Sequence, residues 1–136
     1  MRKHGKVTII FLFIVLMLSC SSTTSSNPSL ADQIVGNFIG ILQNPTGPTL
    51  DYRITITEVN GSRVQIAPAS GNNSATFEAD LTSQTNGGIE SIILTSDSDI
   101  KEASGTFVAS TGRLSYTYHL GGDDDTNLEI FVGDKQ

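Results

Sequence analysis

Arg113-Leu-Ser-Tyr-Thr-Tyr-His-Leu120 alternates polar and apolar side chains at every step. Successive side chains of a β-strand point to opposite faces, so its leucines and tyrosines would share one face and its polar residues the other. The segment 52–57 repeats the pattern, with Tyr52, Ile54 and Ile56 on one face. Both stretches predict strands with one buried side and one solvated side, which is typical of antiparallel sheets.

The same alternation recurs along the chain between clusters of Gly, Asn, Asp and Ser, and no segment shows a helical stripe. We predict strands at residues 34–43, 50–58, 62–68, 75–82, 90–96, 104–109, 113–120 and 126–133. Short strands with tight connections favour an up-and-down meander, and closing it removes exposed strand edges. The expected fold is all-β, a small antiparallel β-barrel of about eight strands over residues 31–136, with a two-sheet sandwich as the less economical alternative.

One hairpin allows a finer prediction. A two-residue loop at Asn60-Gly61 would set Ile56 opposite Gln65 and mix apolar with polar residues on one face. A three-residue loop, 59–61, instead pairs Ile56 with Val64 and Ile54 with Ile66. We therefore expect a type I turn with Gly61 in the left-handed conformation, forming a bulge.

The N-terminus has the order of an export signal. A basic start that includes Arg2, Lys3 and Lys6 precedes an apolar run over residues 7–18, interrupted only by Thr8. A helix needs roughly 20 residues to span a bilayer, so this run is too short for an ordinary permanent anchor. Residues 1–19 are predicted to be a signal peptide.

Leu16-Met-Leu-Ser-Cys20 resembles the lipobox of bacterial lipoproteins, although Met17 and Leu18 are bulkier than that family usually has. The resemblance implies lipidation at Cys20, with fatty acyl chains such as palmitate holding the mature protein on a membrane. The alternative is an ordinary secretory signal, whose small-residue requirement Met17 fits poorly. Ser21, in place of aspartate, favours the outer membrane of a Gram-negative bacterium, on its periplasmic side.

Residues 20–30 are rich in Ser and Thr and predict a flexible tether. All fourteen acidic residues follow Cys20, and three of the eight Lys and Arg residues precede it. The mature chain therefore carries 5 − 14 = −9. That charge argues against binding of nucleic acid and against electrostatic docking on anionic lipid.

Gly36-Asn-Phe-Ile-Gly40 resembles the opening of lipocalin-like (calycin-like) barrels, and 105–107 and 114–118 fit the same pattern. Phe38 stands where true lipocalins have tryptophan. The resemblance implies a barrel that binds a small apolar molecule through inward aromatic residues. The candidate ligand-binding residues are Phe38, Tyr52, Phe107, Tyr116 and Tyr118, with Phe77 also on the inner face.

The alternative for these aromatic residues is that they fill the core, as side chains do in barrels of about eight strands. Small residues expected on the inner face leave room for rings, and they are Gly36, Gly40, Gly105 and Ala109. We expect a mostly filled barrel with at most a shallow pocket near Tyr118 and the segment 123–125.

Catalytic and metal chemistry have few candidates. His119 is the only histidine after Cys20 and falls on a polar strand face, and no further cysteine is present, so an enzyme is not expected. Asp123, Asp125 and Asn127 could ligate Ca²⁺, although Leu128 stands where an EF-hand loop needs glycine. A solvated hairpin tip is the other interpretation, and no cofactor is expected.

Two functions remain open. One is a lipid-anchored binding module for a small apolar molecule or a glycan. The other is a non-enzymatic structural or interaction protein of the cell envelope with a filled barrel. An inner cavity at Tyr116 and Tyr118 would favour the first, and a contiguous apolar patch on the outside would favour the second.

Overall fold

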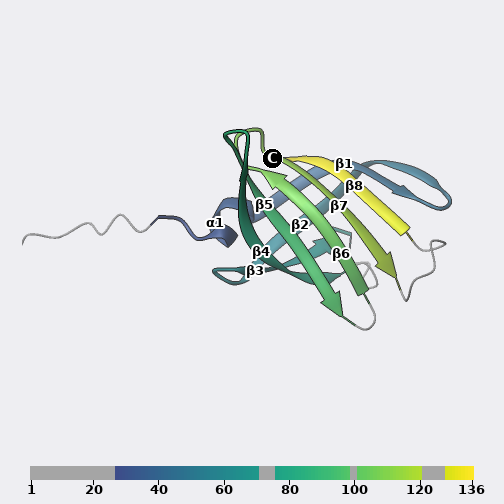
Figure 1. Cartoon of the computed structure of the whole chain (residues 1–136). Coiled ribbons are helices and arrows are strands. Elements are labelled where there is room, and N and C mark those ends of the chain that lie inside the picture. The colour runs from purple at the N-terminus through teal and green to yellow at the C-terminus, as the bar shows by residue number, and fades with distance from the viewer. Residues whose placement is uncertain (1–26, 71–75, 99–100, 121–127) are drawn as a thin grey trace, which may run out of the picture.

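Eight antiparallel strands close into one barrel in the computed structural model, which describes residues 27–70, 76–98, 101–120 and 128–136 (Figure 1). Each strand pairs with its sequence neighbours, and the last pairs with the first. The elements are α1 (Leu30–Ile34), β1 (Gly36–Asn44), β2 (Gly47–Asn60), β3 (Arg63–Pro68), β4 (Phe77–Asn86), β5 (Ile89–Ser98), β6 (Lys101–Val108), β7 (Arg113–Leu120) and β8 (Leu128–Lys135). The predicted up-and-down barrel is confirmed, and the sandwich alternative is wrong.

All eight predicted strands are present, and several extend beyond their predicted bounds, most of all β2, β4 and β6. The extra residues 83–86 of β4 pair with the start of β5 in a hairpin that closes at Gly87-Gly88, both at positive φ. Residues 82–90 are all exposed. Since neither side of this hairpin is buried, its sequence carries no alternation that could have marked the strands.

The short helix α1 was not predicted, because five residues are too few to show a helical stripe. Its N-terminus has a capping box, in which the Asp32 amide donates to Ser29 Oγ at 3.0 Å and the Ser29 amide donates to Asp32 Oδ2 at 2.9 Å. Ala31 and Ile34 are fully buried within the barrel core. The helix therefore closes one end of the barrel (Figure 1).

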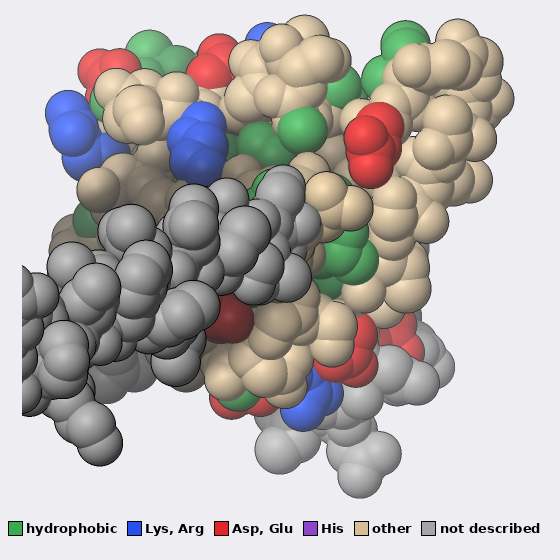
Figure 2. All heavy atoms as spheres, turned by 90° about the vertical axis from the view of Figure 1, so that its left-hand side faces the viewer, with side chains coloured by type: hydrophobic (Ala, Val, Ile, Leu, Met, Phe, Trp, Pro, Cys, Tyr) green, Lys and Arg blue, Asp and Glu red, His purple; other side chains and the backbone are tan. Residues whose placement is uncertain are grey.

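Lys135 of β8 holds α1 in place from inside the same end. Its ammonium donates to the carbonyl oxygen of Gln33 at 2.9 Å, one of the carbonyls that a helix C-terminus leaves without a partner. Figure 2 looks onto this end and shows acidic and basic side chains around it, with hydrophobic side chains in separate small groups.

The barrel core is apolar throughout the described residues, which include no buried polar or charged side chain. Inward positions of every strand contribute to it, as the alternation predicted. Besides Ala31 and Ile34 of α1, the buried hydrophobic residues that make up the core are Phe38, Leu42, Ile54, Ile56, Val64, Ile66, Phe77, Ala79, Leu81, Ile92, Leu94, Ala103, Phe107, Leu114, Tyr116, Tyr118 and Phe131.

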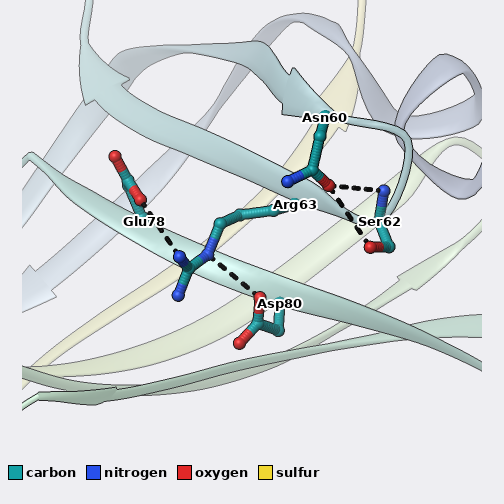
Figure 3. Close-up of polar contacts among 5 residues, drawn as sticks. All are labelled: Asn60, Ser62, Arg63, Glu78 and Asp80. Carbon is teal, nitrogen blue, oxygen red and sulfur yellow. Dashed lines mark hydrogen bonds and ion pairs between the residues drawn. The ribbon is translucent and has the colours of Figure 1, made fainter.

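The β2–β3 hairpin differs from its prediction (Figure 3). Ile56 pairs with Ile66 and not with Val64, and Asn60 pairs with Arg63, so the predicted register and three-residue loop are wrong. The extra residue lies in the strand, between Glu58 and Asn60, where the register shifts. Moving a strand by two residues leaves the same side chains facing inward, so matching apolar faces could not distinguish the two registers.

Gly61 does not adopt the predicted left-handed conformation, since its φ is not positive. The turn is closed by the Asn60 side chain, whose Oδ1 accepts from the Ser62 amide at 3.0 Å and from Ser62 Oγ at 3.3 Å. This is the local side-chain turn that asparagine favours, and it places no conformational demand on Gly61.

Gly61→Ala should therefore leave the domain as stable as before, or stabilise it by up to about 1 kcal/mol through reduced freedom of the unfolded chain. The new methyl group would meet the nearest atom, Ser29 Cβ, at an ordinary 3.4 Å. Urea unfolding monitored by circular dichroism measures this. A loss of more than about 1 kcal/mol would contradict the observed turn.

Ion pairs on the outer surface connect β3 to β4 (Figure 3). Arg63 Nε lies 3.0 Å from Asp80 Oδ1, and Arg63 Nη1 lies 3.7 Å from Glu78 Oε2. All three side chains are about half exposed, so these pairs add little stability, typically below about 1 kcal/mol each. The pairs fit the observed register of β3 and β4, in which Arg63 lies opposite Asp80.

Candidate functional site

Aromatic rings fill the half of the barrel that lies away from α1. Phe77 stacks on Tyr118 with ring centroids 4.7 Å apart, and it meets Tyr116 edge-on at 5.4 Å. Tyr116 stacks on Phe131 at 5.2 Å, and Phe131 contacts Tyr52 at 6.3 Å. The rings therefore form one continuous series of contacts across β2, β8, β7 and β4.

The half of the barrel next to α1 has a second aromatic pair. Phe38 and Phe107 meet edge-on with centroids 5.9 Å apart, and both are buried. The Lys135 ammonium lies 6.0 Å from the centroid of the Phe107 ring, at the limit of a cation–π contact.

Glycines on the inner face allow this close packing. A Cβ at Gly105 would lie 2.6 Å from Tyr116 Cβ, and one at Gly40 would lie 2.2 Å from the Val132 carbonyl oxygen. The rings and the neighbouring strand occupy the space that these glycines leave, as the filled-barrel expectation requires. The prediction that Ala109 faces inward is wrong, because this residue follows the end of β6 and is exposed.

One carboxylate belongs to this aromatic half, at Glu129 of β8, directly opposite Tyr118. Burial raises its pKa above the usual value. Burial, followed by repulsion from the Glu129 charge, raises the pKa of Tyr52 and raises that of Tyr118 to about 12. Burial also raises the pKa of Tyr116 strongly. The phenols are therefore protonated at neutral pH and can donate hydrogen bonds.

The structure places the candidate ligand-binding residues in two groups. Phe38 and Phe107 contact each other near α1. Tyr52, Tyr116 and Tyr118 join the larger group, where Phe131 and Phe77 lie between them. Two members of this group, Phe131 and Glu129, were not singled out from the sequence. The alternation of the predicted strand 126–133 could have identified them, since residues 129 and 131 lie on the same face of it.

A cavity lies on the outer wall, over β5, β6 and β7. It has a volume of about 560 Å³ and is lined by Thr95, Ser96, Glu102, Ala103, Ser104, Thr117 and His119. The pairing explains the arrangement, because Thr95 faces Ser104 and Ser104 faces Thr117 across adjacent strands. Glu102 faces His119 in the next row. We call this cavity the hydroxyl groove.

A second hollow of about 300 Å³ continues the hydroxyl groove toward β8. It shares Ser104 and Thr117 with the first, and Thr106, Ser115 and Ile130 are also in its lining. Within the groove, Thr117 Oγ1 donates to the Ser104 carbonyl oxygen at 3.3 Å. The side chains at the groove offer hydroxyl, carboxylate and imidazole groups on a rigid sheet, which can recognise polar ligands by hydrogen bonding.

Several predicted features lie outside the described residues, namely Cys20, Asp123, Asp125 and Asn127. Within the described ranges, no cluster of three or more His, Cys, Asp or Glu residues could hold a metal ion. Nor does that part of the chain contain a helix long and apolar enough to cross a membrane.

The chain matches no protein-family model, no curated protein and no solved structure.

Proposed function

We propose that this protein is a lipid-anchored, non-enzymatic interaction protein of the cell envelope that binds a glycan in the hydroxyl groove. The proposal rests on the different positions of apolar and polar groups, inside the barrel and on its outer wall. Aromatic rings occupy the barrel interior, whereas hydroxyl groups from three strands line the cavity on the outer wall. This arrangement favours the filled-barrel interpretation over a lipocalin-like module with an apolar ligand inside.

The chemistry of the groove fits a polyhydroxylated ligand. Thr95, Ser104 and Thr117 supply hydroxyls that both donate and accept, and Glu102 supplies a strong acceptor. A volume of about 560 Å³ is within the range of small-molecule sites and suits a glycan fragment of a few rings. Rigid strands position these groups, so binding would require little ordering of the protein.

The proposed location rests on the N-terminal sequence. Lipidation of Cys20 would hold the barrel at the outer membrane. On the periplasmic side, which the sequence favours, it would reach the glycan strands of peptidoglycan, and on the outer surface it would reach those of lipopolysaccharide. The two sources share the chemistry of linked sugar rings, and binding measurements distinguish them.

The groove is tested by calorimetric titration of residues 27–136, which contain the whole barrel and α1, with muropeptides and with lipid-free lipopolysaccharide oligosaccharide. Combining Thr95→Val with Glu102→Gln should weaken binding of the preferred glycan about tenfold or more, since it removes a hydroxyl and a carboxylate charge. Thr82→Val is the matched control, because Thr82 is also exposed, on β4 outside the groove. Failure of both glycans to bind would refute the proposal, and an apolar molecule co-purifying with the barrel would favour the lipocalin-like alternative.

The anchor is tested separately in cells. Metabolic labelling with a radiolabelled fatty acid should tag the wild type, and Cys20→Ser should lose both the label and the signal cleavage that depends on it. Cys20 is the only cysteine of the chain, so no other thiol can take the label. Label that survives the substitution would rule out lipidation at this residue.

A further inference from the structure

The outer wall of the barrel has an apolar side as well as a polar one. Five aliphatic residues of β1, β2 and β8 form it, namely Ile39, Ile41, Leu50, Ile130 and Val132, and we call them the aliphatic wall. Ile41 pairs with Val132 across β1 and β8. Ile39, Ile41 and Leu50 line a shared hollow of about 300 Å³, with Gly40 and Asp51 at its edge. Leu50 is 68% exposed and Ile41 48%, so the wall is a contiguous apolar surface open to solvent.

The exposure of Leu50 depends on an irregularity of the backbone. Leu50 has the same parity as the inward residues Tyr52 and Ile54, so regular alternation would turn it into the core. Gly40 pairs with Tyr52 and Leu42 with Thr49, which leaves Ile41 opposite both Leu50 and Asp51. This is a β-bulge, and Asp51 within it has φ 54°. Bulges redirect side chains, and this one exposes a leucine at the cost of a left-handed residue.

The residue composition of the aliphatic wall favours contact with a lipid bilayer over contact with a protein partner. Protein interfaces depend on a few anchors, most often Trp, Tyr or Arg, and the five residues of the wall include no aromatic side chain. Charged side chains border the wall, since Arg53 and Asp134 pair with Ile39 from either side. A second copy of the chain is disfavoured as well, because each mature chain carries −9 and two would repel.

The short length of chain between the barrel and the proposed anchor also favours a lipid bilayer as the partner of the aliphatic wall. Six residues lie between Cys20 and Asn27, the first described residue, and seven residue steps span at most about 25 Å even when fully extended. A bilayer would therefore be present next to the barrel at high effective concentration. Weak apolar contacts then suffice to hold the domain on the lipid, as exposed aliphatic side chains do in peripheral proteins.

We infer that the aliphatic wall docks the barrel sideways on the bilayer to which the proposed lipid anchor at Cys20 holds it, so this inference rests partly on the proposed function. Apolar insertion of Leu50 and Ile41 drives the contact, and it requires no anionic lipid. The wall is centred on β1, and β7 and β8 separate β1 from β6 at the centre of the hydroxyl groove. The docked barrel would therefore leave the β5 and β6 side of the groove facing away from the lipid.

The absence of tryptophan from the chain allows a direct test. Leu50→Trp places a fluorescent reporter in the wall, and Ile89→Trp places one at a similarly exposed aliphatic position in the β4–β5 hairpin. Each full-length lipidated protein is reconstituted in phosphatidylcholine vesicles. We expect emission from position 50 to shift to shorter wavelength and to be quenched by brominated lipid, whereas emission from position 89 remains that of a water-exposed indole.

Unshifted emission from position 50 in the lipidated protein would overturn the inference. So would a shift that appears without vesicles and grows with protein concentration, which would indicate a second copy, or one that requires a co-purifying protein. Cys20→Ser separates the two proposals. If fatty-acid labelling fails but excess vesicles still shift the emission from position 50, the wall is upheld and the anchor is not. If labelling succeeds and the emission stays unshifted, the anchor is upheld and the wall is not.

Discussion

Phe131→Ala is expected to lower the free energy of unfolding by about 3–5 kcal/mol, enough to unfold much of a marginally stable domain. Phe131 is fully buried, and its ring joins Tyr52 to Tyr116 in the aromatic half of the barrel. Its removal would leave a cavity, because rigid paired strands on every side cannot close in on it. Guanidinium unfolding followed by tyrosine fluorescence and circular dichroism measures the loss.

Ile130→Ala is the matched control, since Ile130 adjoins Phe131 in the chain but points outward and is 36% exposed. It should cost less than about 1 kcal/mol. Should Phe131→Ala be equally mild, the aromatic residues would not be closely packed. A guest molecule could then occupy the interior, and the lipocalin-like interpretation would regain support.

The domain should lose stability steeply above pH 10 because of its buried tyrosines. Burial raises the pKa of Tyr116 strongly, and that of Tyr118 to about 12, from 10.0. Below pH 10 the folded and unfolded chains both keep these protons, so stability is unaffected. Above it, the unfolded chain releases protons that the folded chain retains, and the free energy of unfolding falls by about 1.4 kcal/mol per pH unit for each such tyrosine. The fall continues until the pH reaches the folded-state pKa.

Tyr116→Phe tests this directly, because phenylalanine keeps the ring contacts with Phe77 and Phe131 and removes the titrating group. Unfolding measured at intervals from pH 8 to 12 should show a shallower decline for the variant, with the two proteins diverging only above pH 10. Parallel curves would mean that Tyr116 ionises in the folded barrel as readily as in the unfolded chain.

Alternation in the sequence determined the strands and the all-β class. Each strand has one buried side, so every second residue is apolar, as in 113–120. The same signal placed Tyr116 and Tyr118 inside. The signal disappears where neither side is buried, which is why the last four residues of β4 were not predicted.

Tertiary structure alone decided the register and the bulges. A shift of two residues in the β2–β3 hairpin leaves the same side chains inward, so the alternation fits both registers. Closure of the barrel, which requires every strand to match both neighbours at once, selects one of them. Leu50 has the spacing of a core residue, yet the bulge opposite Ile41 turns it outward. The hydroxyl groove also depends on tertiary structure. Thr95, Ser104 and Thr117 are distant in sequence, and only the pairing of β5, β6 and β7 brings them into one row.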